Sequence, residues 1–344
     1  MTQGHGKSMK FHSTLHLLRL LAFVALFQCS EIHGAERLVG IHSAIAVTQS
    51  LPAIAREAGL FKKNNLDFEL VFIQSSGAAT AAMLGGDAEV GILGAVGVLR
   101  AYLQGAGDFV VVVTIKNILT HSIVARPDIK RPQDLKGKRI GVTRFSSNSH
   151  YFVQQALPRF GLDPNRDVIV RQTGGDVAGL AALINGGVDA MAILTYGPSA
   201  VAQGYPYLIN GPELKIPYAA ASLTTRRSAM ARRPQVLGGY MRALAEAAKI
   251  FHTDKEFALK VLGKFLRIND RKILESTYES EIPAVEQRLD IRADSLQAVL
   301  EEIAPTDARA KSVKPQQLID RKYLDEMEKS GFYESLWGRE RIKN

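Results

Sequence analysis

The chain has almost no cysteine: its 344 residues include one, Cys29. A single thiol excludes an intramolecular disulfide framework and any zinc or iron–sulfur site built from several cysteines. Glycine, with 29 residues, shows no three-residue period, which excludes collagen. Hydrophobic residues make up 46% and charged residues 22%, so the composition is that of an ordinary globular protein. The length predicts about two domains.

Blocks of like charge are also missing, although the net charge is +9. Residues 1–35 hold three basic residues and one acid, which leaves 9 − 2 = +7 for the remainder, scattered along the chain. Nucleic-acid binding requires a basic stripe or a recognisable module, and the sequence has neither, so we expect no nucleic-acid partner. A mildly basic surface, or attraction to an anionic ligand or a membrane surface, accounts for the charge.

The N-terminal 35 residues have the pattern of a secretory signal peptide. A basic stretch over residues 1–19 contains no acid, an apolar run covers residues 20–27, and small and polar residues follow up to Ala35. The apolar run is shorter than the roughly 20 residues that a membrane span needs. We expect cleavage after Ala35 and a periplasmic location. A short buried helix is one alternative, and a lipid anchor on Cys29 is another, which the preceding Gln28 disfavours.

Downstream of this segment the same strand–helix–strand unit occurs twice, at an offset of 101 residues. The matching residues are Gly40 with Gly141, Gly85 with Gly186, Gly86 with Gly187, and Ile92-Leu93 with Ile193-Leu194. Periodicity and glycine punctuation predict strands over residues 37–41, 66–73, 88–93, 110–114, 122–125, 138–142, 167–171, 189–194 and 219–224. They predict helices over residues 52–58, 78–84, 149–160, 177–184, 234–252, 255–265, 270–279 and 293–303, with a last helix from Pro315. Chance reuse of common turns is the alternative explanation of the repeat.

The repeat predicts an α/β fold of two lobes, each with a mainly parallel sheet flanked by helices. The C-terminal helices have no lobe of their own, so we expect the chain to return to lobe 1 after visiting lobe 2. Lobe 1 is then residues 36–128 plus 218–344, and lobe 2 is residues 129–217. Two crossing segments, near residues 126–133 and 212–220, form a hinge with a ligand cleft beside it.

Ligands of open α/β sheets bind beyond the carboxyl ends of the strands, where loops lead into helices. Here those loops are rich in hydroxyl, amide and small residues. The richest, residues 143–149, carries Arg144 and Phe145 and then four polar residues. Simple N-capping of the next helix and capping combined with ligand contact both stay open for this loop, as they do for residues 74–77. Arg144 can pair with an acidic group or be solvated, and Phe145 and Tyr196 can pack on a ligand or at a lobe edge.

The sequence offers little for catalysis. The histidines beyond residue 35 have no metal-ligand spacing, and no P-loop or nucleophile elbow occurs. Residues 94–97 lack the third glycine of a dinucleotide fingerprint. His42, directly after the first strand, is the only plausible catalytic base, and we expect neither an enzyme nor a cofactor.

Three strings resemble the solute-binding proteins of ABC importers. They are PAIAREAGLFKKNNLDFEL, QSSGAATAAMLGGDAEVGIL and RPQDLKGKRIGVTRFSSNSHY. The resemblance covers residues 37–250 and is to the nitrate/sulfonate/taurine-binding group, which is related to thiamine-pyrimidine-synthase-like proteins. It implies a type 2 periplasmic binding fold that closes on a small molecule and delivers it to a membrane permease. We expect a monomer.

The resemblance also implies a set of ligand-binding positions. They are Ser43, Ala44, Ile45, Gln74, Ser75, Ser76, Gly77, Gly94, Ala95, Ser146, Ser147, Asn148, Ser149, Thr195 and Tyr196, to which the loop composition adds Arg144 and Phe145. Two departures narrow the function. The pyrimidine-synthase relatives use a cysteine-rich motif, which is missing beyond residue 35, and residues 43–46 are too apolar for a small inorganic anion. An organic sulfonate or carboxylate is the expected ligand; an enzyme on the same fold, pyrimidine-synthase-like or menaquinone-pathway-like with His42 as its base, is the alternative.

Overall fold

The computed structural model describes residue 1, residues 34–145 and residues 147–338. Most of the predicted signal peptide, Cys29 and the predicted site residue Ser146 lie outside these ranges. Among the described helices, none has both the length and the apolarity that a bilayer crossing requires.

The first sheet contains five strands in the order β2-β1-β3-β10-β4. Their bounds are Leu66–Phe72 for β2, Glu36–His42 for β1, Val90–Leu93 for β3, Ile216–Arg226 for β10 and Phe109–Leu119 for β4. Strand β1 runs parallel to β3, and β10 runs antiparallel to both β3 and β4. Strand β4 is longer than the predicted residues 110–114, because it continues past the buried Lys116 along its pairing with β10.

The second sheet repeats this arrangement in the order β7-β6-β8-β5-β9. Their bounds are Ile169–Gln172 for β7, Arg139–Val142 for β6, Ala190–Ile193 for β8, Ser122–Ala125 for β5 and Tyr207–Ile209 for β9. Strand β6 runs parallel to β7 and β8, whereas β5 runs antiparallel to β8 and β9. The predicted α/β class is confirmed. Each sheet is mixed because one strand, β10 in the first sheet and β5 in the second, runs antiparallel to both of its neighbours.

The offset of 101 residues holds in the strand register. Gly40 is paired with Val90 in the first sheet, and Gly141 is paired with Met191 in the second. A Cβ on Gly40 would lie 2.7 Å from the Phe68 ring, and one on Gly141 would lie 2.7 Å from the Met191 sulfur. Both glycines therefore leave room for a side chain packed on the strand.

The chain changes sheet earlier than the sequence suggested. Strand β5 pairs with β8 of the second sheet, although the predicted boundary at residue 128 assigned it to lobe 1. The change falls between the end of β4 at Leu119 and the start of β5 at Ser122. The break at Arg126-Pro127 misled the prediction, because that break only ends β5. The return falls between β9 and β10, over residues 210–215.

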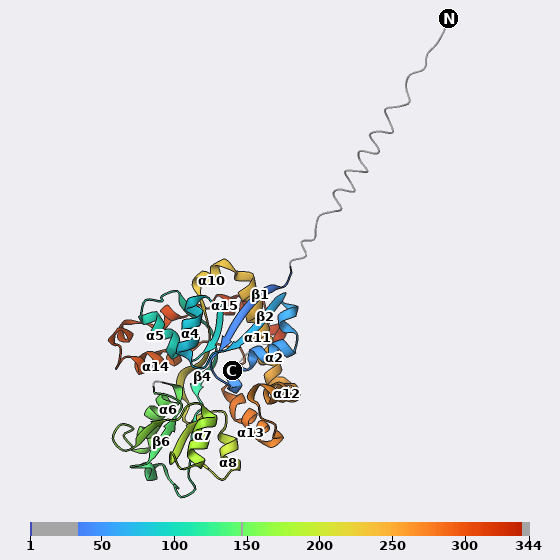
Figure 1. Cartoon of the computed structure of the whole chain (residues 1–344). Helices are drawn as coiled ribbons and strands as arrows, with labels where there is room; N and C mark the ends of the chain where they lie inside the picture. Colours follow the sequence, from blue (N-terminus) through green and yellow to red (C-terminus); the bar gives the residue numbers. More distant parts are fainter. Residues whose placement is uncertain (2–33, 146, 339–344) are drawn as a thin grey trace. The chain divides into compact units, whose positions relative to one another are not determined.

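Helices cover both sheets (Figure 1). Before the chain returns to the first sheet they are α2 Leu51–Glu57, α3 Leu60–Lys63, α4 Ser76–Gly85, α5 Ala95–Leu103, α6 Asn148–Ala156, α7 Asp176–Ile184, α8 Gly197–Ala202 and α9 Gly211–Leu214. After it they are α10 Arg227–Arg232, α11 Pro234–Thr253, α12 Lys255–Leu266, α13 Arg271–Glu281, α14 Ala293–Ile303, α15 Lys322–Lys329 and α16 Phe332–Trp337. Short 3-10 turns include η1 Val47–Gln49 and η6 Pro315–Leu318.

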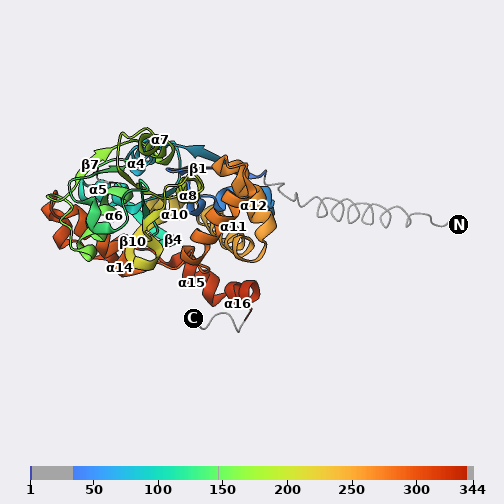
Figure 2. The same cartoon turned by 90° about the horizontal axis from the view of Figure 1, so that it is seen from below.

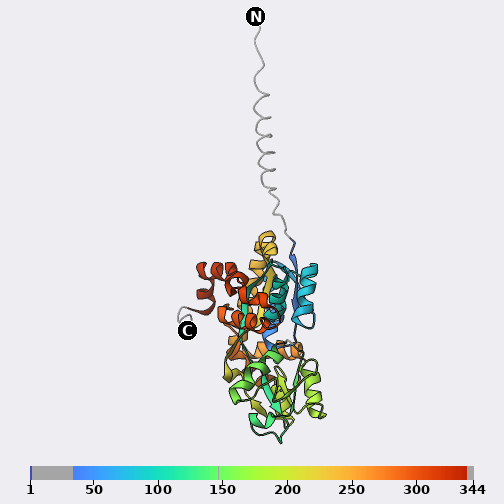
Figure 3. The ribbon, with the colours of Figure 1, turned by 90° about the vertical axis from the view of Figure 1, so that its left-hand side faces the viewer.

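The helices of the C-terminal part pack mainly on the first sheet. Helix α11 contacts α2 and α3, α14 contacts β10 and α5, and α15 contacts β4. Figure 3 shows the red C-terminal helices on one side of the first sheet and the blue and cyan ones on the other. A smaller apolar cluster, which includes Leu180, Met191 and Ala200, joins the second sheet to α7 and α8.

Several helix predictions need correction. The loop after β3 is the single residue Gly94, because Ala95 already begins the unpredicted helix α5. The predicted helix from Pro315 is a 3-10 turn, and α15 starts only at Lys322, whose backbone N–H donates to the Asp320 side chain.

The offset of the repeat changes at the ends of two helices. The left-handed glycines that end α4 and α7 are Gly86 and Gly186, an offset of 100. The loops between strands and helices therefore shift the repeat by one residue.

Candidate functional site

The loops that follow the strands of the two sheets meet each other. The Thr195 hydroxyl lies 3.5 Å from the carbonyl oxygen of Ile45, and the Asn148 amide donates to the carbonyl oxygen of Ala220 at 3.2 Å. A Cβ on Gly94 would lie 3.2 Å from the Asn148 side chain. Residues predicted for the site from both halves are thus in contact with the opposite half.

In the first half, one glutamine side chain holds the loop after β1. The Gln49 carbonyl oxygen accepts the backbone N–H groups of Ser43 and Ala44 at 2.7 and 2.9 Å, and its amide donates to the Ser43 hydroxyl at 3.3 Å. Gln49 is 4% exposed. The resemblance placed Ser43, Ala44 and Ile45 in the site but not Gln49, whose role depends on the turn η1 to bring its side chain back to this loop.

The next loop of the first half leads into α4. The Ser75 N–H donates to the carbonyl oxygen of Ser43, and the Ser75 hydroxyl caps α4 by accepting the N–H of Ala78 at 3.4 Å. Gln74 lies within 3.8 Å of the position that a Cβ on Gly175 would take in the other half. Ser76 and Gly77 form the first turn of α4 and approach Gly97 of α5 so closely that a Cβ there would lie 2.7 Å from Ser76.

In the second half, three hydroxyl groups hold the loop after β6, as Gln49 holds the loop after β1 in the first half. The hydroxyl oxygens of Thr143, Ser147 and Ser149 lie 2.9 to 3.0 Å from one another, and Ser149 also accepts the N–H of Thr143. Ser147 is the N-cap of α6, where its hydroxyl accepts the N–H of His150. Capping by Ser147 is therefore confirmed, and Asn148 is free of that task and reaches the other half instead.

The flanking residues of this loop point outward. Phe145 is 52% exposed, packs edge-on against His150 and donates its N–H to the side chain of Gln172. Arg144 is exposed, and its carbonyl oxygen accepts the Ser147 hydroxyl.

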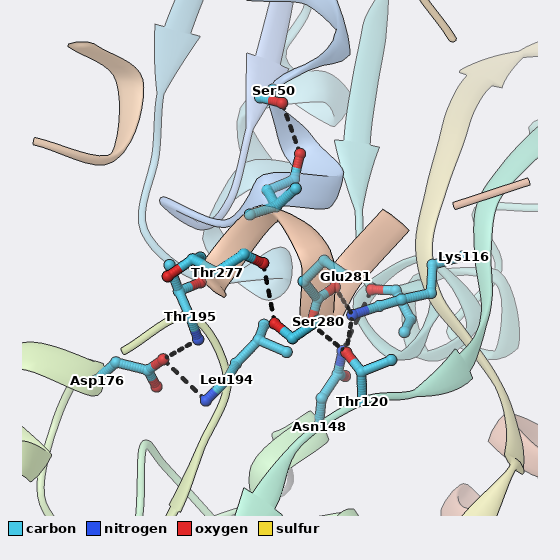
Figure 4. A network of polar contacts seen from close by, with 12 residues as sticks. Ser50, Lys116, Thr120, Asn148, Asp176, Leu194, Thr195, Thr277, Ser280 and Glu281 are labelled. Atoms are coloured by element: carbon cyan, nitrogen blue, oxygen red, sulfur yellow. Dashed lines mark hydrogen bonds and ion pairs between the residues drawn. The ribbon is translucent and has the colours of Figure 1, made fainter. Parts of the chain in front are cut away.

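The loop after β8 depends on a buried carboxylate. Asp176, the first residue of α7, accepts the N–H groups of Leu194 and Thr195 at 3.0 and 2.8 Å (Figure 4). Burial raises the pKa of this carboxyl. Tyr196 follows, and its hydroxyl donates to the carbonyl oxygen of Leu266 at 3.0 Å. Burial and the nearby Asp176 raise the pKa of Tyr196, so the phenol stays protonated.

A buried ion pair lies beside these loops and was not predicted. Lys116 of β4 is 3.1 Å from Glu281 of α13, and Thr120 bonds to both at 2.6 Å (Figure 4). The side chain of Lys116 is 2% exposed and that of Glu281 is 5% exposed. The sequence signal for this ion pair is a lysine three residues after a run of four valines. A charge inside an apolar strand requires a buried partner.

His42 has the contacts of a packed side chain. Its ring lies between Phe72 and Phe265, with centroids 5.0 and 5.1 Å away, and its Nδ1 is 3.1 Å from the carbonyl oxygen of Ala44. Burial lowers the pKa of His42. The packing accounts for the residue without a role in proton transfer.

The junction offers hydroxyl, amide and backbone groups rather than a metal centre. No group of three His, Cys, Asp or Glu side chains among the described residues is placed to hold a metal ion. Two surface hollows lie elsewhere, one between α12 and α13 and one beside α14. The two sets of loops touch directly, so a molecule held between them has to enter while they are apart.

Comparison with known proteins is consistent with this geometry. The model of the NMT1/THI5-like family matches residues 50–258. A taurine-binding periplasmic protein of Escherichia coli is 24% identical over 73% of this chain and 76% of its own. Among solved structures, the periplasmic aliphatic sulphonate binding protein SsuA of Escherichia coli aligns with a TM-score of 0.69 at 20% identity, over 84% of this chain and 99% of its own. The desulfurization enzyme DSZB aligns with a TM-score of 0.62 at 16% identity, over 86% of this chain and 99% of its own.

Proposed function

Because this chain belongs to the NMT1/THI5-like family, we propose that it is the extracytoplasmic binding component of an ABC importer. Its ligand is a small organic anion of the sulfonate or carboxylate type, held between the two sheets. The observation that carries the proposal is that Asn148 and Thr195 reach across to the first half, to Ala220 of β10 and to Ile45 after β1. Asn148 is the first residue of α6, and a helix N-terminus beside neutral donors suits a single acidic group.

We take the two lobes from the sequence prediction, but place the first crossing at residues 120–121, where the chain passes from β4 to β5. The ligand enters when the lobes separate and bridges them when they close, so binding shifts the population toward the closed state. Interactions with both lobes exist only in that state, and their energy is what drives closure.

The same proposal assigns the surroundings of the protein. The first 35 residues direct export to the periplasm, and the protein acts there as a monomer. Its partner is a membrane permease that receives the ligand from the closed form. The taurine and sulphonate relatives support this assignment through their names and their periplasmic location.

Isothermal titration calorimetry of the exported protein tests the proposal. The panel contains taurine, an alkanesulfonate, an aromatic sulfonate and their carboxylate counterparts. At least one compound is expected to bind with one site per chain. Asn148→Ala is expected to weaken that binding about tenfold, since a side chain that reaches across the junction is lost.

Asn64→Ala is the matched control. The Asn64 amide also donates to a backbone carbonyl, that of Leu60, but within a single helical turn of the first half. This variant is expected to bind as the parent does. If no compound binds or shifts the melting temperature, the function is wrong; if both variants bind normally, the site lies elsewhere.

A further inference from the structure

Helices α12 and α13, residues 255–281, belong by sequence to the part of the chain that has returned to the first sheet, yet they also contact the second half. Helix α12 packs against α11 and α2 of the first half, whereas α13 packs against α8 of the second half and against η1 of the first. In Figure 1 these helices lie between the two sheets on the side of α8. We call residues 255–281 the bridging helices.

Between α12 and α13, the bridging helices accept a hydrogen bond from the second half. The Tyr196 hydroxyl donates to the carbonyl oxygen of Leu266, the last residue of α12. Carbonyl groups of a last helical turn have no partner within the helix and carry partial negative charge. A phenol is a good donor to such a group, so this bond is specific in position and direction.

At their C-terminal end, the bridging helices are fixed to the first crossing of the chain. Glu281, the last residue of α13, pairs with Lys116 of β4 and accepts a hydrogen bond from Thr120, which directly follows β4 in the first crossing. All three side chains are buried, and breaking one partner from such a pair is strongly destabilising. The bridging helices therefore stay with the hinge while the second half can move against them.

We propose that Tyr196 is a positioning residue: its bond to Leu266 on the bridging helices latches the second half in the closed arrangement and so sets ligand affinity without touching the ligand. The inference rests on the proposed function, because the latch acts on hinge closure. It reassigns Tyr196, which the resemblance places among the ligand contacts. The two roles of Tyr196 can be distinguished in the ligand-free protein. The bond to Leu266 acts there, whereas a contact with the ligand does not.

The distance between the halves in the ligand-free protein tests this proposal. Spin labels are placed through Ala81→Cys on α4 and Ala181→Cys on α7, two exposed positions, with Cys29→Ser so that no third thiol is present. Figure 2 shows α4 and α7 at the same edge of the molecule. In pulsed electron paramagnetic resonance, Tyr196→Phe is expected to lower the ratio of short to long distances about three- to tenfold, as the loss of one hydrogen bond implies.

Tyr333→Phe is the matched control. The Tyr333 hydroxyl donates to the carbonyl oxygen of Arg288 at 2.7 Å, within the part of the chain that packs on the first sheet. Its distance distribution is expected to equal that of the parent. An unchanged distribution in Tyr196→Phe overturns the latch. If the parent binds no compound of the calorimetry panel, the proposed function fails while the distance measurement still decides the latch.

For a ligand that does bind, Tyr196→Phe is expected to raise the dissociation rate by the same three- to tenfold and to leave the ranking of ligands unchanged. A change in ranking shows that Tyr196 contacts the ligand, which overturns the assignment as a positioning residue.

Discussion

At the start of the paired strands the first sheet has Leu38 and Ala88, whereas 101 residues later the second has Arg139 and Asp189. Leu38 and Ala88 are 1% and 2% exposed and lie in the apolar core. Arg139 and Asp189 form a two-point ion pair with both bonds at 2.9 Å. The strand order and register are repeated, but the side chains that hold the strands together are not.

The two sets of loops differ in the same way. One buried side chain, Gln49, satisfies the backbone of the first half, and a cluster of three hydroxyls does so in the second. A single side chain cannot be replaced by its neighbours, whereas a cluster retains bonds when one member is lost. The first half should therefore depend on single residues more than the second does.

The largest expected effect concerns the buried pair of the first half. Lys116→Met leaves Glu281 buried without its cation and is expected to destabilise the protein by about 3–5 kcal/mol. The double variant Lys116→Met with Glu281→Met is expected to recover most of this loss, because no buried charge remains. Urea unfolding measures both. A double variant as unstable as the single one would show that the pair is not the cause.

Gln49→Leu should have the next largest effect. It leaves the N–H groups of Ser43 and Ala44 without their acceptor, at a cost of about 2 kcal/mol. The measurement is again urea unfolding, supported by faster hydrogen exchange at residues 43 and 44. A loss below about 0.5 kcal/mol would mean that the loop holds itself without Gln49.

The Arg139–Asp189 ion pair of the second half makes the folding stability depend on pH. Arg139 lowers the pKa of Asp189 to about 2, below its usual 3.8. A carboxyl with a lowered pKa stabilises the fold above its unfolded pKa, and this stability is lost as pH falls from about 4 to about 2. Asp189→Asn should cost about 1–2 kcal/mol at pH 7, since Arg139 is one-third exposed, and the difference from the parent should vanish near pH 2. A difference that persists at pH 2 would assign the effect to packing.

The smallest effect is expected in the hydroxyl cluster. Thr143→Val replaces the hydroxyl with a methyl group of similar size. The Ser147 and Ser149 hydroxyls stay 3.0 Å apart and keep their bond. The expected loss is below about 0.5 kcal/mol. A loss as large as that of Gln49→Leu would remove the distinction between the two halves.

The sequence predicted the repeated architecture because its signals are local and periodic. Glycines such as Gly40 and Gly141 mark strands that other side chains cover, and the helix at 293–303 has the predicted bounds. The first crossing was misplaced because Arg126-Pro127 breaks a strand without changing the sheet. Helix α5 was missed because Gly94 and Gly97 suggested a loop, whereas Gly97 allows α5 to approach α4 closely.

The site could be predicted only in part. The sequence places the candidate site on the loops after the strands, because topology brings the carboxyl ends of parallel strands to one edge of a sheet. The supporting side chains come from distant positions: Asp176 holds residues 194 and 195, and Glu281 reaches Lys116 across 165 residues. Such pairings depend on how helices pack, which periodicity does not specify.

We propose that one ligand is held by both halves at once. Hydrogen exchange of the exported protein, with and without a compound that calorimetry has shown to bind, tests it most directly. Ligand-dependent protection is expected in residues 43–49 and in residues 143–149 together, at the same ligand concentration. Protection confined to one of these segments, or appearing only at the hollow between α12 and α13, would contradict it.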